Sequence, residues 1–175
     1  MDIQHPHTIS SDWWNLYCSA FPAEERRSNI THGNALKDKR FHACQLVEGP
    51  QFVGLLTWWQ WPDMIYVEHL AIEEAMRGKG YGKRALQQLQ ELSRDIVLEI
   101  EPVRDSLTQR RLRFYQSCGF AALPYPHTQL AYQHGYRDIP LTLLGWSPSK
   151  ESIDTDKWQL FEMRFAAAPM QYRDR

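Results

Sequence analysis

The chain has 175 residues, of which 43% are apolar and 13% aromatic, so it is long enough for one domain with a hydrophobic core and is not disordered in composition. Its formal net charge of -1 argues against a general nucleic-acid-binding protein, because such proteins draw most of their affinity from cationic side chains that neutralise phosphates. No linker divides the sequence, and we expect a single domain over residues 1–175.

The cysteines and the N-terminal residues bear on the compartment. The three cysteines are widely spaced, without the spacing of a disulfide framework or a metal site. No segment has the roughly 18 consecutive apolar residues of a membrane span, and residues 1–7 lack the pattern of a signal peptide. We therefore expect a soluble cytoplasmic protein with no membrane or nucleic-acid partner and no metal; a homodimer is compatible with the sequence.

The first predicted element is a helix. Ser10 or Ser11 is expected to cap a helix through residues 13–21, and Pro22 ends it. A second short helix is predicted at residues 23–27. A polar connector containing Gly and Asn then leads to the first predicted strand.

A three-stranded meander is predicted next. Residues 41–47 and 51–61 are rich in residues that favour strands and are joined by a short turn, so they form an antiparallel hairpin. A third strand is expected at residues 65–72. A basic glycine loop at residues 77–84 follows it, and the apolar spacing of residues 85–92 predicts a helix.

The remaining elements complete an α/β pattern. A strand is expected at residues 96–101, and a strand, a helix and a second strand with this spacing make a crossover that places the two strands parallel. A helix is predicted through residues 107–118 and ends at Gly119. Later elements are expected as strands at residues 120–123, 128–132 and 140–146 and as a helix at residues 154–165.

The glycine loop, Arg77-Gly78-Lys79-Gly80-Tyr81-Gly82-Lys83-Arg84, is typical of a phosphate site. Glycines allow backbone N–H groups to approach an anion, and the following helix adds the positive end of its dipole. The P-loop pattern fails, because its second glycine would fall at Lys83. The loop therefore predicts a phosphorylated ligand that is bound by a motif other than a P-loop.

A dinucleotide fingerprint is one alternative. Gly80 to Ala85 matches G-x-G-x-x-A between a strand and a helix, and Glu99 lies near the expected acidic position, which would indicate a nicotinamide-dinucleotide-binding protein. Only one helix-plus-strand unit follows the loop, however, and three antiparallel elements precede it. This order of elements disfavours a dinucleotide-binding fold.

Two motifs of this chain point to one family. Arg77-x-x-Gly80-x-Gly82 resembles the acyl-CoA signature of the GNAT acetyltransferases, and Phe114-Tyr115-x-x-x-Gly119-Phe120 resembles the end of that family's later helix. The likeness is strong over residues 52–120. The run Phe21 to Arg27 is similar to a subset of bacterial members. The resemblance implies an α/β (α+β) fold with a mixed, mostly antiparallel central sheet, a splayed parallel strand pair and flanking helices.

The resemblance also implies a function. It predicts an N-acetyltransferase that moves an acetyl group from acetyl-CoA to a primary amine of a small molecule or peptide by direct attack in a ternary complex, without a metal. A non-catalytic acyl-CoA-binding module is the alternative. The residues implied to hold the coenzyme are Leu70, Ala71, Ile72, Arg77, Gly78, Lys79, Gly80, Tyr81, Gly82 and Lys83.

Glu68 and Tyr115 are the candidate catalytic residues. Glu68 lies in a strand that is apolar on both faces, so we expect partial desolvation to raise its pKa toward that of a general base. The alternative is a structural ion pair. Strand alternation sends His69 to the opposite face, as a packed core residue. In the matching family helix the tyrosine protonates the leaving thiolate, which implies that role for Tyr115, whereas Cys118 is expected to be buried.

The acceptor side is less defined. Glu99 and Glu101 share a strand face and could attract a cationic amine, with a salt bridge to Arg110 or Arg111 as the alternative. Trp59 is a tentative acceptor contact, with core packing as the alternative. A polyamine, an amino acid, an aminoglycoside and a protein N-terminus all remain open as acceptors.

Overall fold

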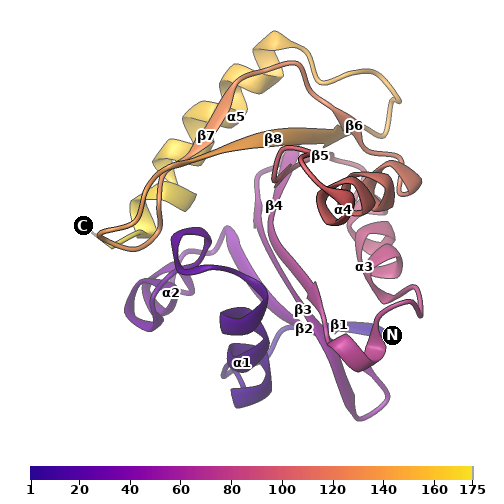
Figure 1. Cartoon of the computed structure of the whole chain (residues 1–175), viewed down its shortest axis with the longest axis vertical. Coiled ribbons are helices and arrows are strands. Elements are labelled where there is room, and N and C mark those ends of the chain that lie inside the picture. Colours follow the sequence, from indigo (N-terminus) through magenta and orange to yellow (C-terminus); the bar gives the residue numbers. More distant parts are fainter. Residues whose placement is uncertain (175) are drawn as a thin grey trace.

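The structure is a computed structural model that describes residues 1–174, with helices on both faces of a central sheet (Figure 1). The strands are β1 (Asp2–Gln4), β2 (Phe41–Glu48), β3 (Gln51–Gln60), β4 (Met64–Ile72), β5 (Asp95–Ile100), β6 (Ala121–Ala122), β7 (His127–Gln129) and β8 (Ile139–Trp146). The α-helices are α1 (Ser11–Ala20), α2 (Asn29–Ala35), α3 (Tyr81–Gln90), α4 (Ser106–Ser117) and α5 (Thr155–Ala167). Short 3-10 helices are η1 (Ala23–Glu25), η2 (Glu74–Met76) and η3 (Pro169–Tyr172). Within residues 1–174, no helix is long and apolar enough to cross a bilayer.

The strand order is β1-β2-β3-β4-β5-β8-β6, with β7 also paired to β8. Only the β4–β5 pair is parallel among the described pairings. The predicted fold class, a mixed and mostly antiparallel sheet, is confirmed. Because a single crossover unit is present in residues 1–174, the doubly wound sheet of the dinucleotide interpretation is contradicted.

The parallel pair separates at one end. Pairing between β4 and β5 runs from Met64 opposite Asp95 to Val67 opposite Leu98, and β4 then continues to Ile72 while paired to β3 alone. The backbone of β4 beyond Val67 therefore has no strand partner on its β5 side in the described residues. This opening is the predicted splay.

Each face of the sheet carries its own core. One core joins α1 and α5 to the sheet through buried aromatic residues that include Trp13, Tyr17 and Phe161, and the other packs α3 through Ala85, Leu86 and Leu89. Alternation along β3 sends Trp59 into the first core and Trp58 into the second. Cys118 is buried in the second core, as predicted.

The N-terminal third departs from the prediction. Residues 23–27 contain only the 3-10 helix η1, whereas α2 lies inside the expected connector. The Ser28 side chain accepts from the Thr31 N–H at 3.3 Å and starts α2, and burial of Ala35 holds it against the sheet. Tertiary contact here outweighs the low helix propensity of a segment that contains Asn, Thr and Gly. Strand β1 was not predicted either.

Candidate active site

The glycine loop forms the entrance to α3. Gly78 has φ +77° and Gly80, the N-cap of α3, has φ +80°, conformations that favour glycine. Arg77 donates from Nε to the Ile72 carbonyl at 3.2 Å, which ties the loop to the end of β4. The loop therefore presents backbone N–H groups and a helix N-terminus together, an arrangement suited to phosphate.

Gly82 has a packing role as well. A Cβ at this position would lie 3.1 Å from Cζ of Phe114, so glycine allows α4 to pack closely against the start of α3. Gly82 and Phe114 lie 32 positions apart in the chain and belong to the two sequence motifs, so the motifs meet at this contact.

A cavity of about 680 Å³, which we call the donor cavity, lies beside this loop. Most of the residues predicted to hold the coenzyme line it: Leu70, Ile72, Arg77, Gly78, Gly80, Tyr81, Gly82 and Lys83. Ala71 instead lines a neighbouring cavity, and Lys79 lies outside both linings, with its Nζ 3.5 Å from Sδ of Met76. The Tyr81 side chain is buried, so it packs in the core and leaves its backbone for the loop.

The neighbouring cavity, of about 400 Å³, is called here the acceptor cavity. It lies between the open end of the β4–β5 pair and the segment that follows α1. The two cavities share Leu70, Ile72, Arg77, Arg111 and Tyr115, so they meet at the splay.

Tyr115 lies where the cavities meet. Burial raises its pKa to about 12, so the phenol carries its proton at neutral pH. Its ring packs edge-on against Phe114 and Phe120. The tyrosine therefore carries its proton where the two cavities meet, and its catalytic role stays a prediction.

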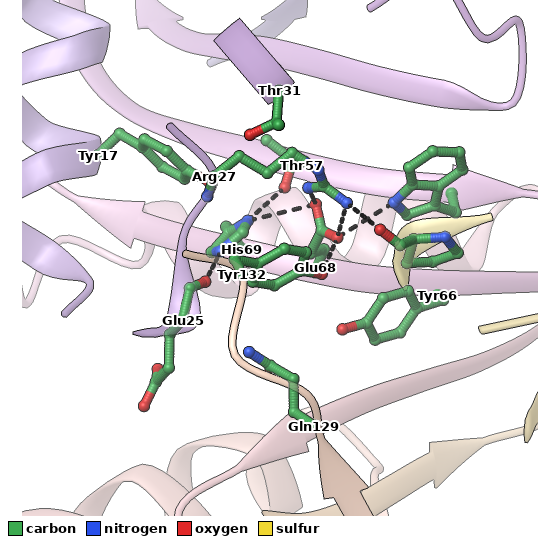
Figure 2. A network of polar contacts seen from close by, with 12 residues as sticks. Tyr17, Glu25, Arg27, Thr31, Thr57, Tyr66, Glu68, His69, Gln129 and Tyr132 are labelled. Atoms are coloured by element: carbon green, nitrogen blue, oxygen red, sulfur yellow. Dashed lines mark hydrogen bonds and ion pairs between the residues drawn. The ribbon is translucent and has the colours of Figure 1, made fainter. Parts of the chain in front are cut away.

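Glu68 is part of a buried ion pair (Figure 2). Its side chain is 1% exposed, and the Arg27 guanidinium, which is 0% exposed, donates Nη1 to Oε2 at 2.5 Å and Nη2 to Oε1 at 2.8 Å. Trp59 Nε1 at 3.2 Å and the Tyr132 hydroxyl at 2.5 Å also donate to Oε1.

This ion pair corrects one expectation. Desolvation raises the pKa of Glu68, but the Arg27 charge and the hydrogen bonds outweigh it and hold the pKa below its usual range. The predicted raised pKa is wrong. The carboxylate is ionised and already accepts four hydrogen bonds, which suits the structural alternative.

A β-bulge places Glu68 and His69 together. Thr57 pairs with His69 and Trp58 with Val67, so Glu68 is the extra residue on β4. His69 Nδ1 then lies 3.5 Å from Glu68 Oε2, and the prediction that the two side chains occupy opposite faces is wrong. The prediction that His69 packs in the core is confirmed, since it is 3% exposed.

His69 also fixes the N-terminal segment. Its Nε2 lies 2.7 Å from the backbone carbonyl of Glu25, and because a carbonyl only accepts, Nε2 carries the proton. Its Nδ1 lies 3.0 Å from the Thr57 hydroxyl. The segment after α1 is thereby attached to β4.

Trp59 does not line the acceptor cavity. Its side chain is 0% exposed, packs with Phe41 and Tyr172, and donates to Glu68. The tentative assignment of Trp59 as an acceptor contact is therefore wrong for this structure, and the alternative, core packing, is correct.

Glu101 and Glu99 both line the acceptor cavity. Glu101 pairs with Arg104 at 2.7 Å and with Arg111 at 2.5 Å, so the alternative of a salt bridge to Arg111 is realised. Glu99 accepts from the Tyr66 hydroxyl at 2.6 Å. Whether Glu101 also attracts the acceptor stays a prediction.

His127 bridges Glu99 to a second carboxylate. Its side chain is 0% exposed, its Nε2 contacts Glu99, and its Nδ1 lies 2.6 Å from Oε1 of Glu162 on α5. Although burial alone would lower the pKa of His127, these two carboxylates raise it to about 9. The charged imidazolium thus ties β7, β5 and α5 together.

Sequence reasoning missed three residues near this site. Arg27 and Glu25 lie in a run that drew notice only for its family resemblance, and His127 lies in a region with no motif. A buried arginine has no local signature, because its partner lies 41 residues away in the chain. For Glu25 a weak signal was available, since it lies in the connection that follows Pro22, and connections often carry functional residues.

Comparisons with known proteins agree with this geometry. The model of the Acetyltransferase (GNAT) family matches residues 9–120. The Bacillus subtilis protein named "Putative acetyltransferase YjbC" is 31% identical over 151 residues, which cover 81% of this chain and 73% of that protein.

Solved structures give the same result. A GNAT-family protein from Bacteroides thetaiotaomicron superposes with a TM-score of 0.81 at 28% identity, over 95% of this chain and 97% of that one. An aminoglycoside 6'-N-acetyltransferase complexed with coenzyme A has a TM-score of 0.62 at 16% identity, over 83% and 96%, and supports the fold alone. The family match, the relative and the fold together show that this chain belongs to the GNAT family of acetyltransferases.

Proposed function

We propose that this acetyltransferase moves the acetyl group of acetyl-CoA to a primary amine, by direct attack of the amine while both substrates are bound. The observation that carries the proposal is the meeting of the donor and acceptor cavities at Leu70 and Tyr115. A shared boundary of this kind brings the two reactants together without a covalent enzyme intermediate. No nucleophilic residue is needed, and Cys118 is buried.

The donor cavity fits the chemistry of a coenzyme A pyrophosphate. The loop from Arg77 to Lys83 supplies backbone N–H groups, cationic side chains and the start of α3. The backbone of β4 at residues 70–72 supplies hydrogen-bonding groups on its open side, where an amide-containing arm can pair as an added strand. A backbone N–H near Leu70 would then face the thioester carbonyl oxygen and stabilise the negative charge that develops there.

The residues of the site account for each part of the transfer. A neutral amine from the acceptor cavity forms the new C–N bond, and the C–S bond breaks. Tyr115 gives its proton to the departing sulfur and regains a proton from solvent. The amine nitrogen loses one proton to solvent, which balances the proton that Tyr115 regains, so the sum is an amide, a free thiol and no net change in the enzyme.

Gly80→Val should raise the KM for acetyl-CoA by at least about tenfold, because a side chain at φ +80° shifts the backbone N–H groups that bind phosphate. Gly135→Val is the matched control, because Gly135 has φ +88° and equally open surroundings but lies outside the donor loop. Steady-state kinetics with acetyl-CoA varied checks this. Equal effects of the two variants on KM would contradict the assignment of the loop.

Tyr115→Phe should lower kcat by about tenfold with little change in either KM, because a thiolate leaving group needs only modest help from an acid. Tyr136→Phe, at a side chain that is 51% exposed, is the control. Release of free thiol measures both. An unchanged kcat for Tyr115→Phe would show that this hydroxyl does not protonate the sulfur.

The proposal as a whole is tested by mixing wild-type protein, acetyl-CoA and a panel of amines, and by following free thiol. The panel contains a polyamine, amino acids, an aminoglycoside and a peptide with a free N-terminus. We expect amine-dependent thiol release. Stabilisation by acetyl-CoA in a thermal shift experiment without release for any amine would instead favour a non-catalytic acyl-CoA-binding module.

A further inference from the structure

Glu25 is held at the wall of the acceptor cavity by its backbone. It is the last residue of η1, the short helix that follows Pro22, and its backbone carbonyl accepts the hydrogen bond from His69 Nε2 at 2.7 Å. Two residues later, the Arg27 N–H donates to the Tyr17 hydroxyl at 3.0 Å inside the core. These contacts at residues 25 and 27 therefore fix where the Glu25 side chain begins, and Glu25 lines the cavity.

The carboxylate of Glu25 differs from the others at this cavity. Glu68 is bound by Arg27, Glu99 by Tyr66 and His127, and Glu101 by Arg104 and Arg111. Within residues 1–174, no hydrogen bond or ion pair reaches the Glu25 carboxylate. Figure 2 shows it pointing away from the Arg27–Glu68 network. It is thus the cavity carboxylate with its oxygens free to accept a proton.

The charges around Glu25 suit that task. Partial burial is the largest cause of a raised pKa for this carboxyl, and the negative charge of Glu101 on β5 adds to it. The neighbouring Glu24 raises the pKa further, whereas His69 on β4 and Arg111 on α4 lower it without reversing the shift. A raised pKa brings a carboxylate closer to the range in which it can both take and release a proton near neutral pH.

We propose that Glu25 accepts the proton that the acceptor ammonium must lose before its nitrogen attacks the thioester. The inference rests on the proposed function and assigns one step of it. The N–H bond of the ammonium breaks, its electron pair stays on nitrogen as the attacking lone pair, and the proton bonds to a Glu25 oxygen. Glu25 then releases this proton to solvent through the open side of the cavity.

The assignment explains two features at once. An ammonium provides the missing partner for the Glu25 carboxylate, so the same contact binds the acceptor and activates it. It also separates two roles that sequence reasoning gave to one residue, since Glu68 holds the N-terminal segment in place through Arg27 whereas Glu25 faces the substrate.

The test compares Glu25→Gln with Glu24→Gln, a matched control one residue away on η1 that lies outside the cavity lining. With an amine that the wild type acetylates, kcat/KM for the amine is measured between about pH 5 and about pH 9. Glu25→Gln should lower kcat/KM at neutral pH by about a hundredfold and replace the acidic limb set by Glu25 with a rise that follows deprotonation of the free amine. Glu24→Gln should stay within about twofold.

Two further measurements separate this role from a structural one. The KM for acetyl-CoA should be unchanged in Glu25→Gln, and Glu25→Asp should restore part of the lost rate while keeping the acidic limb. Thermal unfolding of each variant reports whether it is folded. If Glu25→Gln unfolds, Glu25→Asp carries the comparison, with an expected loss of about tenfold in kcat/KM and a shifted acidic limb.

The outcomes that overturn the inference are distinct from failure of the proposed function. An active wild type with a Glu25→Gln profile that keeps its rate and its acidic limb excludes Glu25 as the proton acceptor. A profile whose acidic limb disappears only in Glu99→Gln moves the role to Glu99. A wild type that releases no thiol with any amine overturns the proposed function itself, and the role of Glu25 with it.

Discussion

Replacing Arg27 with Met should lower the free energy of unfolding by about 3–5 kcal/mol. Arg27 is completely buried, and its guanidinium binds both oxygens of Glu68 and the Pro169 carbonyl, the latter at 2.9 Å. Without it, the Glu68 carboxylate is left as an unpaired charge in the core. Urea denaturation followed by tryptophan fluorescence measures the loss.

Two comparisons isolate the buried charge as the cause. Arg26→Met removes a neighbouring guanidinium that, within residues 1–174, makes one hydrogen bond, to the Phe21 carbonyl at 3.1 Å, and should cost about 1 kcal/mol. The double variant Arg27→Met with Glu68→Leu should be more stable than Arg27→Met alone, because it no longer buries a lone charge. A loss for Arg27→Met no larger than that of Arg26→Met would mean that the ion pair does not carry this energy.

The His127 contact should make stability depend on pH. Its pKa is raised from the ordinary 6.5 to about 9, so the folded state binds the proton more tightly than the unfolded state. The contribution is fully present below about pH 6.5 and is lost as pH rises through about 9. A shift of this size corresponds to a contribution on the order of 3 kcal/mol.

The measurement is the difference in unfolding free energy between wild type and His127→Gln, determined at about pH 6 and about pH 9.5. The difference should be large at the lower pH and shrink by a few kcal/mol at the higher pH. His134→Gln, at an exposed histidine, is the control and should change little at either pH. A difference that is the same at both pH values would argue that His127 is not charged between its two carboxylates.

The loop beside the donor cavity was predictable from the sequence because the residues that indicate it are close together in the chain. The glycines, the basic residues and the start of α3 lie within eight positions, from Arg77 to Arg84, and each one constrains the backbone or the charge of its neighbours. The Phe114–Tyr115 motif is equally compact. The order of the predicted elements along the sequence then indicated the fold, since a meander followed by one crossover unit permits few sheet arrangements.

The acceptor side was less predictable because its contacts are long-range. The expected raised pKa of Glu68 followed from its strand, but the result depends on Arg27, which is 41 residues away. The bulge at Glu68 changes the direction of one side chain, and period-two alternation cannot reveal it. The helix α2 is stabilised by burial more than by propensity.

The contact between the Arg27 guanidinium and the Pro169 carbonyl spans 142 positions of the chain, and it has a consequence for the order of assembly. The buried residues of the core that packs α3 lie between Cys44 and Leu144 and can associate without the segment around Pro169. Arg27 cannot be buried with all its partners until that segment docks. On refolding, this core should therefore form before Arg27 is enclosed, since contacts between distant residues form late.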